Sequence, residues 1–155
     1  MKAIIYNKAK LNRKVLFKGL EHGYNTYPTD FDMIFNLRNE INIIVDAKEK
    51  GKKPVFGQTI TYVNISAALQ AQGIPSYIVW VEHDHSLDDI LLEECLVSLV
   101  WHDSTWVTRK QICDKFECDI TYGDFQKLIL NRHNVGIYNP HKHKFDKKKY
   151  LPPTV

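Results

Sequence analysis

Thr29–Gln58, TDFDMIFNLRNEINIIVDAKEKGKKPVFGQ, is the stretch that decides the fold of this chain. It contains two apolar segments, Phe31–Leu37 and Ile41–Lys48, and each has the length and composition of a β-strand. The segment between them, Leu37-Arg38-Asn39-Glu40, is short and mostly polar, as in a turn. The stretch therefore predicts a β-hairpin.

Charged side chains gather on this hairpin. Successive side chains of a strand point to opposite faces, so Asp46 shares a face with Lys48, and Asp30 shares a face with Asp32. Pairing of the strands would bring up to three carboxylates and one ammonium group to one place. Such a cluster makes a poor core, but it can hold a divalent metal ion beside a phosphate.

The residues after the hairpin predict a helix and then a buried strand. The helix should run over residues 56–70 and end at Gly73. Its apolar positions with helical spacing are Ile60, Val63, Ala67 and Ala68, the pattern of an amphipathic helix. Pro75–Glu82 is apolar over nearly its whole length, which is typical of a strand buried on both faces.

The C-terminal part predicts a second hairpin followed by helices. Strands are expected over residues 93–101 and 105–107, joined at residues 102–104. Thr108-Arg109-Lys110-Gln111 has the spacing of a capping box, so a helix should follow it to Phe116.

A second cap at Thr121 predicts another helix, to about Asn131. The fold class is thus α/β: a mixed central sheet of about four strands flanked by helices, with a C-terminal hairpin and small helices. We expect residues 1–107 to form the core. Residues 108–155 are expected to form a C-terminal helical extension and basic tail packed on the same domain.

Composition narrows the classes of protein. The chain has 155 residues, 44% of them hydrophobic and 25% charged, which suits one compact domain. A net charge of +3 permits a nucleic-acid partner. The three cysteines lack metal-site spacing, which suits a reducing compartment, and no apolar run is long enough to cross a membrane. We therefore expect a cytoplasmic protein, or one delivered to a host cytoplasm.

The charged cluster suggests a site for Mg²⁺ or Mn²⁺. Such hard cations bind oxygen ligands, usually one or two carboxylates with water and phosphate. Asp32 and Asp46 are the expected carboxylates, and the Ala47 carbonyl is a third oxygen. Either Asp of the Asp30/Asp32 pair could be the principal ligand; Asp32 is favoured, and Asp30 is kept as a second carboxylate of that pair. Lys48 would orient or deprotonate the attacking water, or stabilise the charge that builds on the phosphate. A polar strand edge with a surface ion pair is the alternative.

The predicted helix is expected to bring Gln58 and Tyr62 to this site. They are four residues apart and share one face of the helix. This face could point back at the end of the Asp46 strand, with Gln58 bonding the water nucleophile or Lys48. The alternative is a polar helix end with a half-buried tyrosine.

Five short motifs carry a family resemblance. They are Phe17-Lys18-Gly19-Leu20, Tyr27-Pro28-Thr29-Asp30-Phe31-Asp32, Asp46-Ala47-Lys48, Phe56-Gly57-Gln58 and Glu82-His83. In this order they resemble the PD-(D/E)XK nuclease superfamily, and within it a subgroup of small proteins of phages and bacteria. The resemblance covers about residues 17–106.

The resemblance implies a restriction-endonuclease-like fold and metal-dependent hydrolysis of phosphodiester bonds. In its terms Asp32, Asp46, Lys48 and Gln58 are the catalytic residues. The chain departs from the family pattern at two positions, with Asp46 where glutamate is more usual and Met33 where the subgroup often has glycine. It also lacks a clear glutamate in an N-terminal helix.

Other residues are expected around the site. Tyr24 and Tyr27 could stack on unpaired bases, and Lys50, Lys52 and Lys53 are expected to contact nucleic acid. Glu82 and His83 are candidates for a supporting role, as is Tyr62. A zinc site at His83 and His85 is a weaker alternative, because no third ligand is evident. Residues 141–149 form a basic tail that should add phosphate affinity.

The function expected from the sequence is a metal-dependent nuclease, with DNA favoured as substrate. The main rival is a non-catalytic binding or inhibitor protein on a nuclease-like scaffold, such as a phage antagonist of host defence. A DNA-binding regulator is a third class. A protein partner or a homodimer stays open, and no membrane association is expected.

Overall fold

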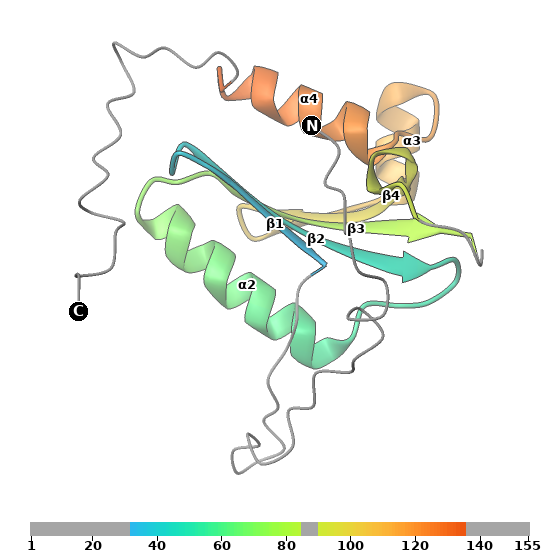
Figure 1. Ribbon diagram of the computed structural model, residues 1–155, viewed down its shortest axis with the longest axis horizontal. Coiled ribbons are helices and arrows are strands. Elements are labelled where there is room, and N and C mark those ends of the chain that lie inside the picture. The colour runs from blue at the N-terminus through green and yellow to red at the C-terminus, as the bar shows by residue number, and fades with distance from the viewer. Residues whose placement is uncertain (1–31, 85–89, 136–155) are drawn as a thin grey trace, which may run out of the picture.

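The computed structural model describes residues 32–84 and 90–135 (Figure 1). Within these ranges the chain forms one five-stranded sheet in the order β1-β2-β3-β4-β5. The strands are β1 (Met33–Leu37), β2 (Ile41–Glu49), β3 (Ser76–His83), β4 (Leu96–His102) and β5 (Thr105–Thr108). β2 and β3 are parallel, and every other neighbouring pair is antiparallel. The predicted α/β class with a mixed sheet is confirmed.

Helices cover both faces of this sheet. α2 (Phe56–Ala71) makes the crossover that two parallel strands require, and it lies on one face. α3 (Arg109–Phe116) and α4 (Tyr122–Arg132) lie on the other face (Figure 1). Their buried side chains join the same apolar cluster as those of β2 and β3. The second hairpin, β4 and β5, extends the sheet to five strands, where about four were predicted.

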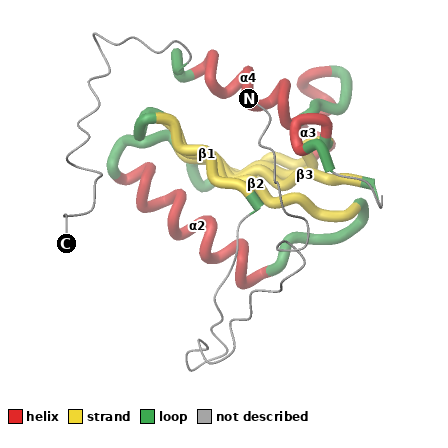
Figure 2. Tube along the Cα trace, in the orientation of Figure 1, coloured by secondary structure: helices red, strands yellow, loops and turns green. Residues whose placement is uncertain are grey.

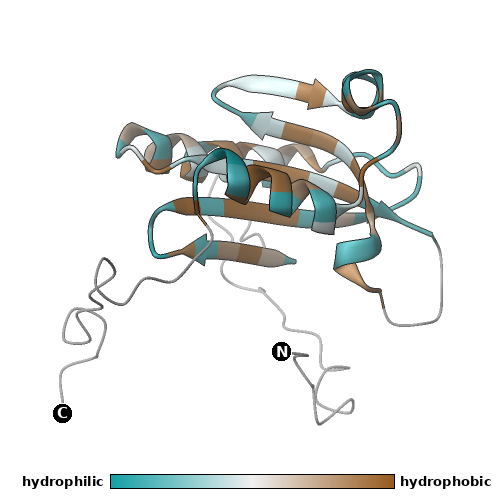
Figure 3. Ribbon diagram, turned by 90° about the horizontal axis from the view of Figure 1, so that it is seen from above, coloured by the Kyte–Doolittle hydropathy of each residue, from teal (hydrophilic) through white to brown (hydrophobic). Residues whose placement is uncertain are grey.

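The central strands form the core because both of their faces are buried. The first six residues of β2 and of β3 are all buried. Figure 3 shows the hydrophobic colour concentrated in these middle strands. The prediction of a strand buried on both faces is confirmed for β3 and extends to β2.

Both hairpins turn through residues with left-handed backbone conformations. The β1–β2 turn has positive φ at Arg38 and Asn39, and the β4–β5 turn has positive φ at Asp103 and Ser104. Two consecutive residues with positive φ match the twist of the flanking strands. Asn and Asp tolerate this conformation better than most residues, which agrees with the predicted turn positions.

Capping explains where the C-terminal helices start. The Thr108 side chain accepts a hydrogen bond from the Gln111 amide, and the Gln111 side chain accepts one from the Thr108 amide at 2.8 Å. The predicted capping box is thus confirmed. Thr121 caps α4 by accepting from the Asp124 amide at 3.3 Å. Gly73, with φ of 79°, follows the end of α2.

Two local predictions are wrong. The start of β4 is displaced, because Leu92–Glu94 form a 3₁₀ turn and the strand begins only at Leu96 (Figure 2). The predicted apolar face of α2 is mostly exposed: Val63 packs against the core, but Ile60 is 45% exposed, and Ala67 and Ala68 are exposed as well. The fully buried positions are Tyr62 and Ser66.

The error on α2 has a physical cause. Apolar residues occur all round this helix, and Phe56 and Ile65 are also exposed. Helical spacing alone therefore does not select one face. Contacts with the sheet select it, because Tyr62 packs near Trp80 and Gln58 bonds Lys48.

Candidate active site

The hairpin register places two carboxylates side by side. β1 pairs antiparallel with β2, and Met33 lies opposite Val45. One step further along this register, Asp32 comes opposite Asp46. Directly opposed residues of an antiparallel pair project to the same face. Asp32 is anchored there, because its Oδ2 accepts a hydrogen bond from the Ala47 amide at 2.7 Å.

Asp46 is a buried carboxylate, and its two oxygens differ in their hydrogen bonding. The residue is 2% exposed, and its Oδ1 accepts a hydrogen bond from Lys48 Nζ at 2.9 Å. Its Oδ2 is buried, and no donor among residues 32–84 and 90–135 reaches it. Burial raises the pKa of the Asp46 carboxyl above its usual value, and nearby Asp32 raises it further. Lys48 lowers this pKa but does not cancel the rise.

Lys48 connects the hairpin to α2. Its Nζ binds Asp46 and also donates to Gln58 Oε1 at 3.1 Å. Gln58 lies in the first turn of α2, so one ammonium group joins a strand end to a helix start. The Lys48 side chain is 20% exposed, so solvent still reaches it. The predicted residues Asp32, Asp46, Lys48 and Gln58 are therefore together in space.

Tyr62 lies one helical turn beyond Gln58 and faces the sheet. It is fully buried, and its ring centroid is 6.3 Å from that of Trp80. Ile44 and Ile78 complete the apolar cluster around it. The half-buried tyrosine of the alternative interpretation does not occur. This packing holds α2 against the sheet at the position from which Gln58 reaches Lys48.

The donor set fits a hard divalent cation in one specific respect. The partnerless Oδ2 of Asp46 is a buried, electron-rich atom that a cation would satisfy. Mg²⁺ often binds through only one or two carboxylates, and Asp32 and Asp46 supply two. Among the described residues, no three His, Cys, Asp or Glu side chains form a group that could hold a metal. Asp30, the other predicted carboxylate, lies outside the described residues.

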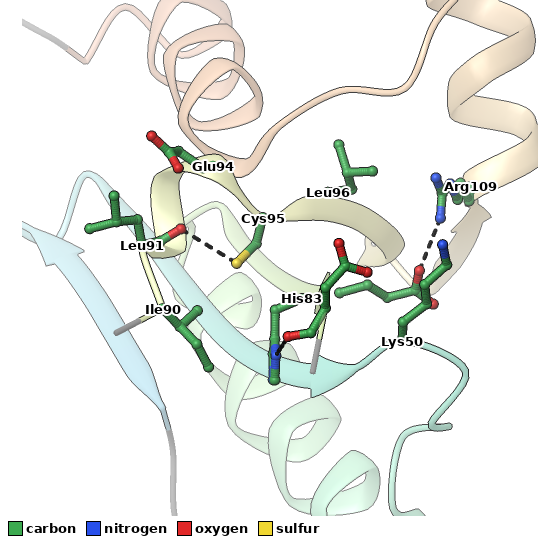
Figure 4. A pocket seen from close by; sticks show the side chains of 10 residues that line it. Lys50, His83, Ile90, Leu91, Glu94, Cys95, Leu96 and Arg109 are labelled. Atoms are coloured by element: carbon green, nitrogen blue, oxygen red, sulfur yellow. Dashed lines mark hydrogen bonds and ion pairs between the residues drawn. The ribbon is translucent and has the colours of Figure 1, made fainter. Parts of the chain in front are cut away.

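Glu82 and His83 are placed beside this cluster, in a separate cavity at the carboxyl end of β3 (Figure 4). Glu82 accepts a hydrogen bond from Arg109 Nη1 at 2.9 Å, and the His83 ring contacts the Asp84 carbonyl at 3.0 Å. Lys50 lines the same cavity. The structure thus gives Glu82 and His83 partners other than the Asp46 cluster.

The remaining predicted residues divide into two groups. Lys52 and Lys53 are exposed between β2 and α2, where they face solvent. The others, Tyr24, Tyr27, His85 and the basic tail, lie outside the described residues.

An arginine network was missed by the sequence reasoning. Arg109 binds Glu82 and also donates two hydrogen bonds to Asp119, at 2.9 and 2.6 Å. The capping box located Arg109 at a helix start, but no local pattern links it to a strand residue 27 positions earlier. Arg109 holds the pKa of the Asp119 carboxyl well below its usual range. The ion pair between Arg109 and Glu82 of β3 holds the start of α3 against the sheet.

Comparison with known proteins finds no family model, no curated protein and no solved structure that matches the chain. In the described ranges, no helix has the length and apolar character needed to span a membrane.

Proposed function

We propose that the protein is a divalent-metal-dependent nuclease that hydrolyses phosphodiester bonds, with DNA as the favoured substrate. The observation that carries this proposal is the position of Lys48 between Asp46 and Gln58, with Asp32 opposite. A strand aspartate, Asp-x-Lys and a helix glutamine are the elements of the PD-(D/E)XK pattern that the sequence resembles.

Each residue of the cluster has a role in this proposal. Asp32 and Asp46, with the Ala47 carbonyl, would hold Mg²⁺ or Mn²⁺. The bound cation supplies Lewis-acid chemistry, which polarises a phosphoryl oxygen and acidifies water. Lys48 orients the attacking water or offsets the negative charge that grows on the phosphate. Gln58 fixes the position of the Lys48 ammonium group.

Substrate contact would come from groups around the cluster. Lys50, Lys52 and Lys53 follow β2 and are exposed, so they can approach a phosphate backbone. Tyr24 and Tyr27 are proposed to stack on unpaired bases. The three cysteines are free thiols, which agrees with a reducing cytoplasm of a bacterium or phage-infected host.

A binding or inhibitor protein is the second candidate. One observation favours it: the ion pair with Lys48 already occupies one of the two oxygens of Asp46. A scaffold that keeps this pair closed could bind nucleic acid or a protein without cutting.

A cleavage assay separates the two candidates. The full chain is incubated with plasmid, linear and single-stranded DNA in Mg²⁺, Mn²⁺ or EDTA. We expect cleavage that requires the metal ion and that EDTA abolishes. The variants Asp46→Asn and Lys48→Met should each lose this activity. Asp114→Asn is the matched control, because this exposed aspartate in α3 only pairs with Lys110. DNA binding without cleavage in either metal would favour the binding protein.

A further inference from the structure

A second cavity lies on the sheet face opposite α2. It is bounded by β4 and β5 on one side and by α3 and α4 on the other. Its volume is about 490 Å³, against about 260 Å³ for the cavity at Glu82. Small-molecule sites typically enclose roughly 300–1,000 Å³. Of these two cavities in the described part of the chain, the one between β4–β5 and α3–α4 reaches that range.

The walls of this cavity are mainly apolar. The apolar lining residues are Val100, Val107, Ile112, Phe116, Phe125, Leu128 and Ile129. Phe116 is 38% exposed and Leu128 is 43% exposed, so apolar surface continues to solvent. A cavity with this lining favours the apolar body of a ligand.

The inner polar groups of the cavity already have partners. The Tyr77 ring stacks on His102 at 3.9 Å, and the Tyr77 hydroxyl is 2.7 Å from His133 Nε2. His102 Nε2 lies 3.2 Å from Asp103. Burial raises the pKa of Tyr77 and lowers the pKa of His133, so both are neutral near pH 7. This part of the wall therefore offers little charge to a ligand.

Two exposed cations line the same cavity. They are Lys115 of α3 and Arg132 of α4, and Asp103 is the one carboxylate among the lining residues. Arg132 has no carboxylate partner within the described part of the chain. Two cations against one carboxylate leave a net positive charge on the lining.

We propose that this cavity binds a small amphipathic organic anion, a carboxylate with an aromatic or aliphatic body. The body would lie against Val107, Phe125 and Leu128, and the carboxylate would lie at Arg132 and Lys115. An apolar lining and two exposed cations together fit this class of ligand, whereas neither a neutral apolar molecule nor a cation would use both. The proposal does not depend on the nuclease function.

Calorimetric titration of the full chain with 1-naphthaleneacetate tests the charge requirement. The neutral control is 1-naphthaleneacetamide, which has the same rings and no charge. We expect the acid to bind more tightly than the amide. Arg132→Gln and Lys115→Gln should each weaken acid binding by about fivefold, as for a partly exposed ion pair, and leave amide binding unchanged. Lys127→Gln, in α4 but outside the cavity lining, should change neither affinity.

A second variant tests the apolar wall. Leu128→Ala should weaken both compounds, while a thermal melt stays cooperative because Leu128 is partly exposed. The proposal is overturned if the acid does not bind, if acid and amide bind equally, or if Lys127→Gln acts like Arg132→Gln. It is also overturned if light scattering gives a dimer that Leu128→Asp dissociates, because a second copy would then cover the cavity.

Discussion

At the scale of single residues, Asp46 is the unusual group of this protein. A carboxylate at 2% exposure loses most of its hydration, and the ion pair with Lys48 offsets part of this cost. Among the described residues, no donor reaches its second oxygen. A residue placed in this way costs folding stability, and it is kept for chemistry more readily than for structure.

The raised pKa of Asp46 predicts a specific pH dependence. The usual pKa is 3.8, and in the folded state the carboxyl holds its proton to higher pH. Between the usual pKa and the higher pKa of the folded state, the folded protein binds more protons than the unfolded chain. The free energy of unfolding therefore falls as the pH rises through this range. Asp46→Asn removes this fall. Its stability advantage over the wild type should grow from below pH 3.8 upwards and then level off.

Urea unfolding of both proteins at a series of pH values measures this difference. The control is Asp114→Asn, which replaces an exposed carboxyl. The dependence of its stability on pH should match that of the wild type. Parallel curves for Asp46→Asn and the wild type would mean that Asp46 does not titrate in this way.

Removal of Lys48 should have the opposite effect on stability. Lys48→Met leaves the buried Asp46 carboxylate without a donor, which should cost about 2 kcal/mol of unfolding free energy near neutral pH. The double variant Asp46→Asn/Lys48→Met should regain most of this loss. A double-mutant cycle in urea measures the coupling, and additive effects would show that the two side chains act independently.

At the scale of elements, α2 is held by its contact face and not by its apolar pattern. Ser66 is fully buried on that face, and its hydroxyl has no hydrogen-bond partner in the described part of the chain. Its small size allows the helix to approach the sheet. Tyr62, one turn earlier, fills the space against Trp80.

Ser66→Ala should therefore stabilise the protein. It removes a buried, unsatisfied hydroxyl and raises helix propensity, which together give about 0.5–1 kcal/mol. Ala67→Ser, at the next and exposed position, should cost about 0.5 kcal/mol through propensity alone. Thermal and urea unfolding measure both changes. A destabilised Ser66→Ala would indicate that the hydroxyl has a partner when the protein is in solution.

At the scale of the whole molecule, the sheet assembles the site from separate elements. The β1–β2 register supplies Asp32 opposite Asp46, the parallel pair β2–β3 buries Asp46, and the α2 crossover returns Gln58 to Lys48. The opposite face, with α3 and α4, carries the separate cavity. The two faces therefore offer two different chemistries on one core.

A metal that binds this assembly should stabilise the fold. By linkage, a ligand that binds only the folded state at a hundredfold excess over its Kd adds about 2.7 kcal/mol. We expect Mn²⁺ to raise the Tm of the wild type and of Asp114→Asn. It should have little effect on Asp46→Asn or Asp32→Asn. An equal rise in all four proteins would place the binding of Mn²⁺ elsewhere.

Local sequence patterns were sufficient for most of the elements. Alternation and apolar runs located the strands, and Thr108 and Thr121 located the helix starts, because these signals act over a few residues. The alternation of side chains along a strand also predicted that Asp46 and Lys48 share one face. The proximity of Asp32 followed from the expected hairpin.

Tertiary structure alone decided the other features. It selected the buried face of α2, joined β4 and β5 to the main sheet, and paired Arg109 with Glu82. It also left Asp46 Oδ2 without a donor and opened the cavity beside Arg132. These outcomes depend on packing between residues far apart in the chain. The sequence by itself determined which elements form and which charges can meet, and packing determined what each of them touches.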